Sequence, residues 1–72
     1  MKRVYVVNCL EAGIRSNPED PNLASDIIGT VKSGTRIQID ETTRYYDWTD
    51  HSFYKCKTDV GGGYINTELV NY

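Results

Sequence analysis

Cysteine is scarce in this sequence, and the two that occur lie far apart. Cys9 and Cys56 are too few for a disulfide framework. They also lack the close spacing and the additional histidine or cysteine ligands of a structural zinc site. We therefore expect two reduced, buried thiols that pack as small apolar side chains. A bridge between them would need Cα atoms within about 7 Å, and the sequence leaves that alternative open.

Long apolar runs and one-sided charge are missing too. No stretch reaches the roughly 18 apolar residues of a membrane-spanning helix, and the start lacks the order of charged, apolar and small residues of a signal peptide. The formal net charge is -2, with both signs mixed along the chain. Because nucleic-acid-binding domains usually carry a basic face and a high pI, we expect a soluble chain with no nucleic acid and no membrane among its partners.

Length sets the next limit. A chain of 72 residues buries only about 60% of its unfolded surface on folding, which leaves little stability for a strained catalytic pocket. We expect residues 1–72 to form a single domain that is not an enzyme and that holds no cofactor or metal.

The apolar side chains that are present favour strands. Most are Val, Ile and Tyr, with few Leu and Ala, a mixture typical of pleated sheets. Short runs of these residues predict strands at 3–7, 26–31 and 63–65, and alternation with a period of two predicts strands at 36–40 and 53–58. Such short strands, separated by frequent turns, predict an all-β barrel or sandwich.

Turn signals separate these strands. The prolines in GIRSNPEDPN, residues 13–22, predict a long ordered loop. Gly34 is expected in a turn with positive φ, and DVGGG at 59–63 in a hairpin. The tail TELVNY, 67–72, is expected to form a single helical turn and a short closing strand.

The predicted core consists of Val4, Val6, Ile14, Ile28, Val31, Ile37, Ile39, Tyr54, Cys56, Ile65 and Leu69.

Four segments in order resemble the bacterial SH3 domain family: IRSNP at 14–18, IIGTVKSGTRIQI at 27–39, FYKCKT at 53–58 and GGYINTELV at 62–70. The resemblance implies a partly open SH3-like barrel of about five to seven short antiparallel strands. It also implies a non-catalytic module that binds peptidoglycan, through its peptide stem or cross-bridge, in Gram-positive cell wall. Such a module targets a peptidoglycan hydrolase, either a phage endolysin made in the host cytoplasm or a secreted autolysin.

The sequence departs from the family pattern in three places. Asn17 stands where a glycine is common, residues 18–26 are longer than usual, and residues 44–52 insert aromatic side chains in place of a short loop. Enlarged loops in a binding module suit a changed specificity.

The segment RYYDWTDHSFYK, residues 44–55, is the main candidate site. Tyr54 is expected in the barrel wall, but neighbours on a strand point to opposite faces, so a small barrel cannot bury all the other rings. We expect stacking from Tyr45, Tyr46, Trp48 and Phe53, and polar contacts from His51, Asn17 and Asp20. The loop from 17 to 26 would form the opposite wall of the groove, and its carboxylates suit a free amine.

Other interpretations of these residues are weaker. Asp50, His51 and Ser52 are consecutive on one loop and therefore do not match the geometry of a catalytic triad. Cys56 is expected to face inward, away from His51. No regular ligand spacing supports a metal held by Asp47, Asp50 and His51.

Two further functions stay open. The domain could be an intracellular interaction module that binds a partner peptide, or a structural domain packed on a catalytic neighbour. A single small site would bind weakly, so tandem copies or a homo-oligomer are expected to add avidity.

Overall fold

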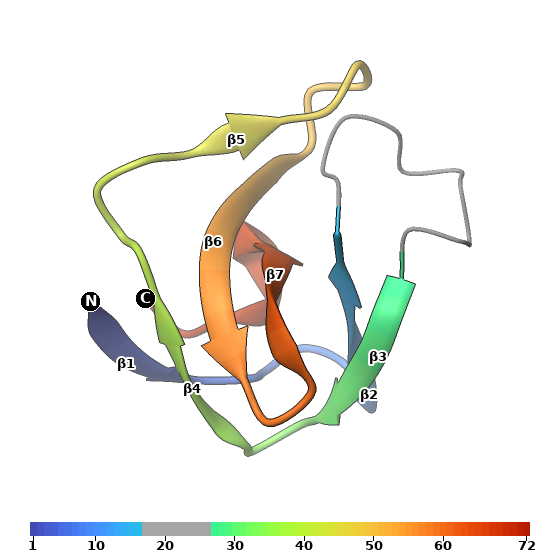
Figure 1. Cartoon of the computed structure of the whole chain (residues 1–72), viewed down its shortest axis with the longest axis vertical. Helices are drawn as coiled ribbons and strands as arrows, with labels where there is room; N and C mark the ends of the chain where they lie inside the picture. The colour runs from blue at the N-terminus through green and yellow to red at the C-terminus, as the bar shows by residue number, and fades with distance from the viewer. Residues whose placement is uncertain (17–26) are drawn as a thin grey trace.

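The computed structural model describes residues 1–16 and 27–72, which form one antiparallel sheet (Figure 1). Its strands are β1 (Lys2–Tyr5), β2 (Glu11–Arg15), β3 (Ile27–Lys32), β4 (Arg36–Ile39), β5 (Tyr45–Tyr46), β6 (Ser52–Thr58) and β7 (Gly61–Asn66). They are ordered β1-β4-β6-β7-β2-β3, with β5 paired to β6, and the sheet does not close into a barrel. The all-β prediction is confirmed, and the open sheet is compatible with an SH3-like arrangement.

The two ends of the chain meet and brace this open sheet. Val6 forms an isolated bridge with Val70, and the Val7 amide donates to the Leu69 carbonyl at 2.9 Å. The Gly34 amide donates to the Val6 carbonyl at 2.8 Å, which links the same segment to the turn between β3 and β4. The termini accordingly lie on the same side of the molecule (Figure 1).

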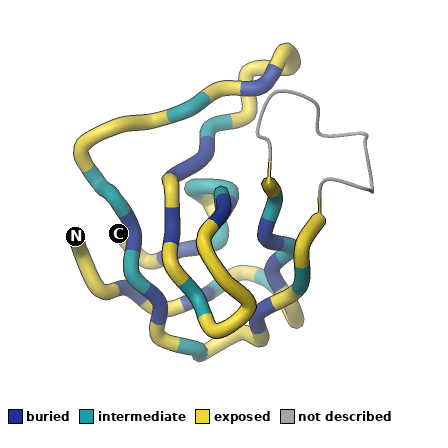
Figure 2. The backbone as a smooth tube through the Cα atoms, in the orientation of Figure 1, coloured by how far each residue is buried: buried dark blue, intermediate teal, exposed yellow. Residues whose placement is uncertain are grey.

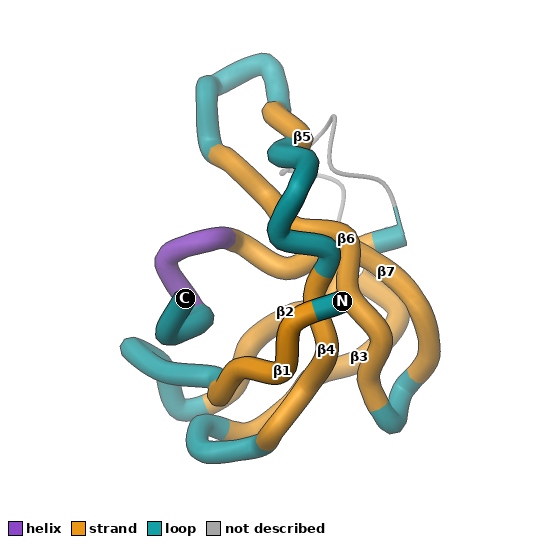
Figure 3. The backbone as a smooth tube through the Cα atoms, turned by 90° about the vertical axis from the view of Figure 1, so that its left-hand side faces the viewer, coloured by secondary structure: helices purple, strands orange, loops and turns teal. Residues whose placement is uncertain are grey.

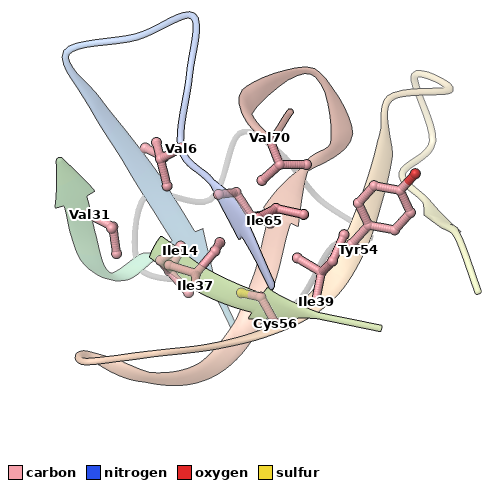
Figure 4. Packing of buried hydrophobic residues seen from close by; sticks show 11 residues of the cluster. Val6, Ile14, Val31, Ile37, Ile39, Tyr54, Cys56, Ile65 and Val70 are labelled. Carbon is pink, nitrogen blue, oxygen red and sulfur yellow. The ribbon is translucent and has the colours of Figure 1, made fainter. Parts of the chain in front are cut away.

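Alternate residues of the strands fill a single core (Figures 2 and 4). Nine of the predicted core residues are buried; Leu69 only packs against the cluster, and Ile28 is 43% exposed. Ile28 was wrongly assigned because Gly29 and Val31 are the β3 residues that lie opposite the buried Ile14 and Ala12 of β2. The sequence interpretation also missed Ala12, Phe53 and Val70, all of which are buried.

Strand β2 was not predicted, and its residues 13–15 were expected to belong to the loop over 13–22. It forms because Ala12 and Ile14 alternate and are both fully buried, while pairing with β3 runs from Glu11↔Lys32 to Arg15↔Ile27. The intervening Gly13 weakened the strand signal in the sequence. The predicted loop over 13–22 therefore begins later than expected, and its part from residue 17 onward lies outside the described residues.

The predicted turns are confirmed. Gly34 has φ +85, and the hairpin between β6 and β7 turns at Asp59 and Val60, followed by Gly61 at φ +114. The helical turn is the 3-10 helix η2 (Thr67–Leu69), capped by the Asn66 side chain, which accepts from the Glu68 amide at 2.8 Å. Both thiols are free; Cys56 is buried as expected, whereas Cys9 is only half-buried.

Candidate functional site

The hairpin of β5 and β6 projects from the rest of the sheet and carries most of the predicted site (Figures 1 and 3). Tyr45 pairs with Phe53 and Tyr46 with Ser52, so a loop of residues 47–51 joins the two strands. The exposed fractions are 57% for Tyr46 and 68% for Trp48. The expectation that a small barrel cannot bury all the rings of this segment is confirmed.

The structure divides the predicted aromatic wall between two faces. Tyr45 packs edge-on against Tyr64 of β7, with ring centroids 5.1 Å apart. Phe53 is on the same face as its partner Tyr45, but it is only 4% exposed. The expected surface stacking by Phe53 is therefore corrected, because neighbouring groups cover its ring. Tyr46, next to Tyr45 on the strand, faces the opposite side.

Tyr54 anchors the hairpin to the core, as predicted. Its ring is 2% exposed and meets the Tyr72 ring edge-on at 6.0 Å. Arg44 lies over the same ring at 5.5 Å, and its Nη2 donates to the Tyr54 hydroxyl at 3.2 Å. These contacts fix β6 beneath the projecting loop.

Asp47 holds the loop between β5 and β6 together. Its Oδ1 accepts hydrogen bonds from the Thr49 amide at 2.8 Å, the Thr49 hydroxyl at 2.7 Å and the His51 amide at 3.0 Å. The Asp47 amide donates to the His51 carbonyl at 3.1 Å, and Asp50 adopts a left-handed φ of 65. Trp48 is thus presented from a tightly bonded turn.

The same network fixes the orientation of the His51 ring. Because the Thr49 hydroxyl donates its only proton to Asp47, it must accept from His51 Nδ1, which lies 2.7 Å away. Asp47 Oδ2 is 3.3 Å from the same nitrogen. The proton therefore resides on Nδ1, and in the neutral ring Nε2 is a hydrogen-bond acceptor available to a ligand.

Acidification should open this loop. Burial by itself raises the pKa of Asp47, but hydrogen bonds from Thr49 and His51, with the nearby His51 charge, bring it below the ordinary value of 3.8. Ionised Asp47 therefore stabilises the folded loop fully at a pH above its unfolded-state pKa. That stabilisation is lost as the pH falls through the lower folded-state pKa. We expect a fluorescence change of Trp48, the single tryptophan, below about pH 4. Asp47→Asn has no carboxylate at this position to titrate, so the variant should lack this fluorescence change. The same transition in Asp47→Asn would show that Asp47 is not the group responsible.

A depression of about 350 Å³ lies beside the hairpin. It is lined by Gly13, Arg15, Ile27, His51, Phe53, Asn66 and Leu69, from β2, β3, β6, β7, the loop and η2. Asn66 Oδ1 accepts from the Glu68 amide, so its Nδ2 is left to donate. The depression thus combines apolar surface with the Asn66 donor and the His51 acceptor, and Arg15 is also part of its lining.

The predicted site residues are only partly brought together. His51 and Phe53 line the depression, while Tyr46 and Trp48 are on the hairpin beside it. Asn17 and Asp20 lie outside the described residues. Sequence reasoning missed Asn66 and Tyr64, because their proximity to the hairpin depends on the pairing of β6 with β7. Only the register of that pairing could have identified them.

The groups that were considered for catalysis are held by burial or by other hydrogen bonds. Burial raises the pKa of the Cys56 thiol to about 11, so the thiol is protonated at neutral pH. Ser52 Oγ is hydrogen-bonded to Thr67 Oγ1 at 2.6 Å, and Asp47, not Asp50, is the carboxylate beside His51.

Within residues 1–16 and 27–72, no set of three or more His, Cys, Asp or Glu side chains is placed to hold a metal ion. No helix in those ranges has the length and apolar character to cross a bilayer.

Comparison with known proteins found no matching family model, no similar curated protein and no similar solved structure.

Proposed function

We propose that the chain is a non-catalytic module that binds the peptide portion of peptidoglycan and targets a hydrolase, of the endolysin or autolysin type, to Gram-positive cell wall. The observation that carries the proposal is the pair of exposed rings, Tyr46 and Trp48, on a projecting hairpin whose loop is held by Asp47. A rigid loop presents large aromatic surfaces to a ligand at small entropic cost.

The depression beside the hairpin suits a peptide. The amide of Asn66 donates a hydrogen bond, and Nε2 of neutral His51 accepts one. A peptide unit offers the complementary pair, a carbonyl acceptor and an N–H donor. Ile27, which is 42% exposed, supplies apolar contact for the side chains or methylene groups that flank that unit. A stem or cross-bridge peptide satisfies these requirements without any reaction being needed.

The test is cosedimentation of the purified chain with insoluble cell walls from several Gram-positive species. We expect the Tyr46→Ala, Trp48→Ala double variant to bind at least about tenfold more weakly, since truncating two exposed aromatic anchors removes much of the contact energy. Leu10→Ala is the matched control, because it removes another exposed apolar side chain. Leu10 is 90% exposed and lies away from the hairpin, where its backbone carbonyl accepts a hydrogen bond from the Ser33 amide. Circular dichroism checks that every variant folds.

Each outcome decides between the alternatives. Loss of pelleting in the double variant but not in Leu10→Ala supports the wall-binding proposal and the aromatic site. If the original chain pellets with no wall type, the proposal fails and a module for a partner peptide takes its place. If binding persists in the double variant, the wall-binding proposal stands, but Tyr46 and Trp48 are not the binding site. We further propose that tandem copies or oligomers add avidity to this single small site.

A further inference from the structure

A second surface feature lies away from the aromatic hairpin, on the outer face of β1, β4 and β6. A shallow depression of about 350 Å³ there is lined by Arg3, Arg36, Ile37, Gln38, Lys57, Thr58 and Asp59. We call Arg3, Arg36, Gln38 and Lys57 the basic row. Figure 3 shows the side of the molecule on which β1 and β4 run next to each other.

The strand register explains why these side chains meet. Arg3 lies directly opposite Gln38, and Gln38 lies directly opposite Lys57, so the three form one line across the strands. Adjacent strands are about 4.8 Å apart, which places the backbones of Arg3 and Lys57 about 10 Å apart with Gln38 between them. Arg36, two residues from Gln38, is on the same face about 7 Å along β4. The inward Ile37 and Ile39 confirm this alternation.

No side chain of the basic row forms an ion pair within the described residues. Arg3, Arg36 and Lys57 are all exposed, and the one ion pair found in residues 1–16 and 27–72 joins His51 to Asp47. Asp59 is the single carboxylate lining the depression, against three cations. A chain with a formal charge of -2 thus carries a locally positive strip, and such a strip attracts anions.

We propose that the basic row binds the phosphates of an extended phosphodiester chain, with one phosphate seated over Gln38. Arginine and lysine on either side would supply charge-assisted hydrogen bonds, and the Gln38 amide group can donate between them. The cations are spread over about 10 Å by about 7 Å, a larger area than one phosphate covers. An extended chain, rather than a single small anion, fits that spread.

The surroundings favour a chain without bases. Sites for single-stranded nucleic acid combine a basic groove with aromatic side chains on which bases stack. None of the side chains that line this depression is aromatic. Tyr5, the neighbouring ring, already has the Arg36 guanidinium 5.9 Å from its centroid. A chain of polyols joined by phosphodiesters needs no such platform.

The test is a titration of the isotope-labelled chain with a short glycerol phosphate oligomer, followed by chemical shifts. We expect saturable shifts at the amides of Arg3, Gln38 and Lys57. Lys57→Gln should weaken binding about tenfold and reduce the salt-dependence slope by roughly one, as expected for one lost phosphate contact. Lys32→Gln is the matched control, because it removes the same charge from exposed β3 outside the depression, and it should change affinity less than about twofold.

Three results would overturn the proposal. The first is an absence of saturable shifts at the basic row, and the second is an equal loss of affinity in Lys32→Gln, which would indicate diffuse charge attraction. The third is tighter binding of oligothymidylate with the same number of phosphates, which would identify a nucleic-acid surface instead. Arg3→Gln provides a second variant if Lys57→Gln does not fold. The Tyr46→Ala, Trp48→Ala variant should bind the oligomer normally, so this proposal can fail independently of peptidoglycan binding.

Discussion

Replacing Gly63 with alanine is expected to lower the free energy of unfolding by about 2 to 4 kcal/mol, because overpacking a tight core contact is strongly destabilising. A Cβ at this position would lie 2.7 Å from the Arg15 carbonyl oxygen and 2.7 Å from Ile14 Cγ2. The first neighbour is backbone, and Ile14 is fully buried, so neither can move aside cheaply. Urea denaturation, followed by circular dichroism, measures the change.

The neighbouring glycine supplies the control. Gly62→Ala is the same chemical change one residue away, yet its Cβ would meet nothing closer than the Cys56 carbonyl oxygen at 3.8 Å. We expect it to alter stability by less than about 1 kcal/mol. Equal destabilisation by the two variants would mean that loss of glycine as such, and not the close approach at Gly63, sets the cost.

Gly63 matters for the site because it allows β7 to approach β2 closely. The contact of β7 with β2 joins the pair β2–β3 to the rest of the sheet, and its register contains the single partnership Arg15↔Tyr64. Gly13 and Arg15 of β2 and Ile27 of β3 line the depression beside the hairpin together with residues of β6 and β7. Widening the junction should therefore open the depression as well as destabilise the fold.

The sequence predicts those parts of the fold that depend on local alternation and turn chemistry. The strands around Ile37, Tyr54 and Ile65 follow from apolar residues two apart, and Gly34 is in its expected turn. Strand β2 was missed because Gly13 interrupts its apolar alternation. Its stability comes from burial of Ala12 and Ile14 against distant strands, which no local pattern reveals.

The site was less predictable than the fold because it depends on the register between strands and on which side chains are covered by neighbouring parts of the chain. Composition identified the aromatic segment, and the exposure of Tyr46 and Trp48 agrees with it. The burial of Phe53 could not be derived, since it depends on what covers the outer face of β6. The basic row is likewise invisible in the sequence, because Arg3, Gln38 and Lys57 come from three separate strands.

Asp47 carried a signal that sequence reasoning did not use. An aspartate followed two residues later by threonine is typical of a turn in which the carboxylate accepts a local amide hydrogen bond. The structure shows this bond between Asp47 and the Thr49 amide at 2.8 Å. The residue that organises the site is therefore one that is itself only 5% exposed.

Under the proposed function, removing the Asp47 carboxylate should abolish most of the wall binding while leaving both exposed rings, Tyr46 and Trp48, in place. In Asp47→Ala the Thr49 and His51 amides and the Thr49 hydroxyl lose their shared acceptor, so Trp48 and His51 are no longer held in one arrangement. We expect binding in the cosedimentation assay to fall at least about tenfold, because the loop must then be ordered by the ligand itself. Faster amide hydrogen exchange at Thr49 and His51 should accompany the loss.

A graded series separates this positioning role from simple loss of charge. Asp47→Asn keeps one oxygen for the three donors but places an amide group where His51 Nδ1 now meets Oδ2, so we expect a loss between about twofold and tenfold. Asp50→Asn removes the same charge from an exposed neighbour and suits the left-handed φ of 65 at that position. It should bind within about twofold of the original chain. If Asp50→Asn weakened binding as much as Asp47→Ala, the ligand would be sensing the negative charge of the loop, and the hydrogen bonds of Asp47 would not be what presents Trp48.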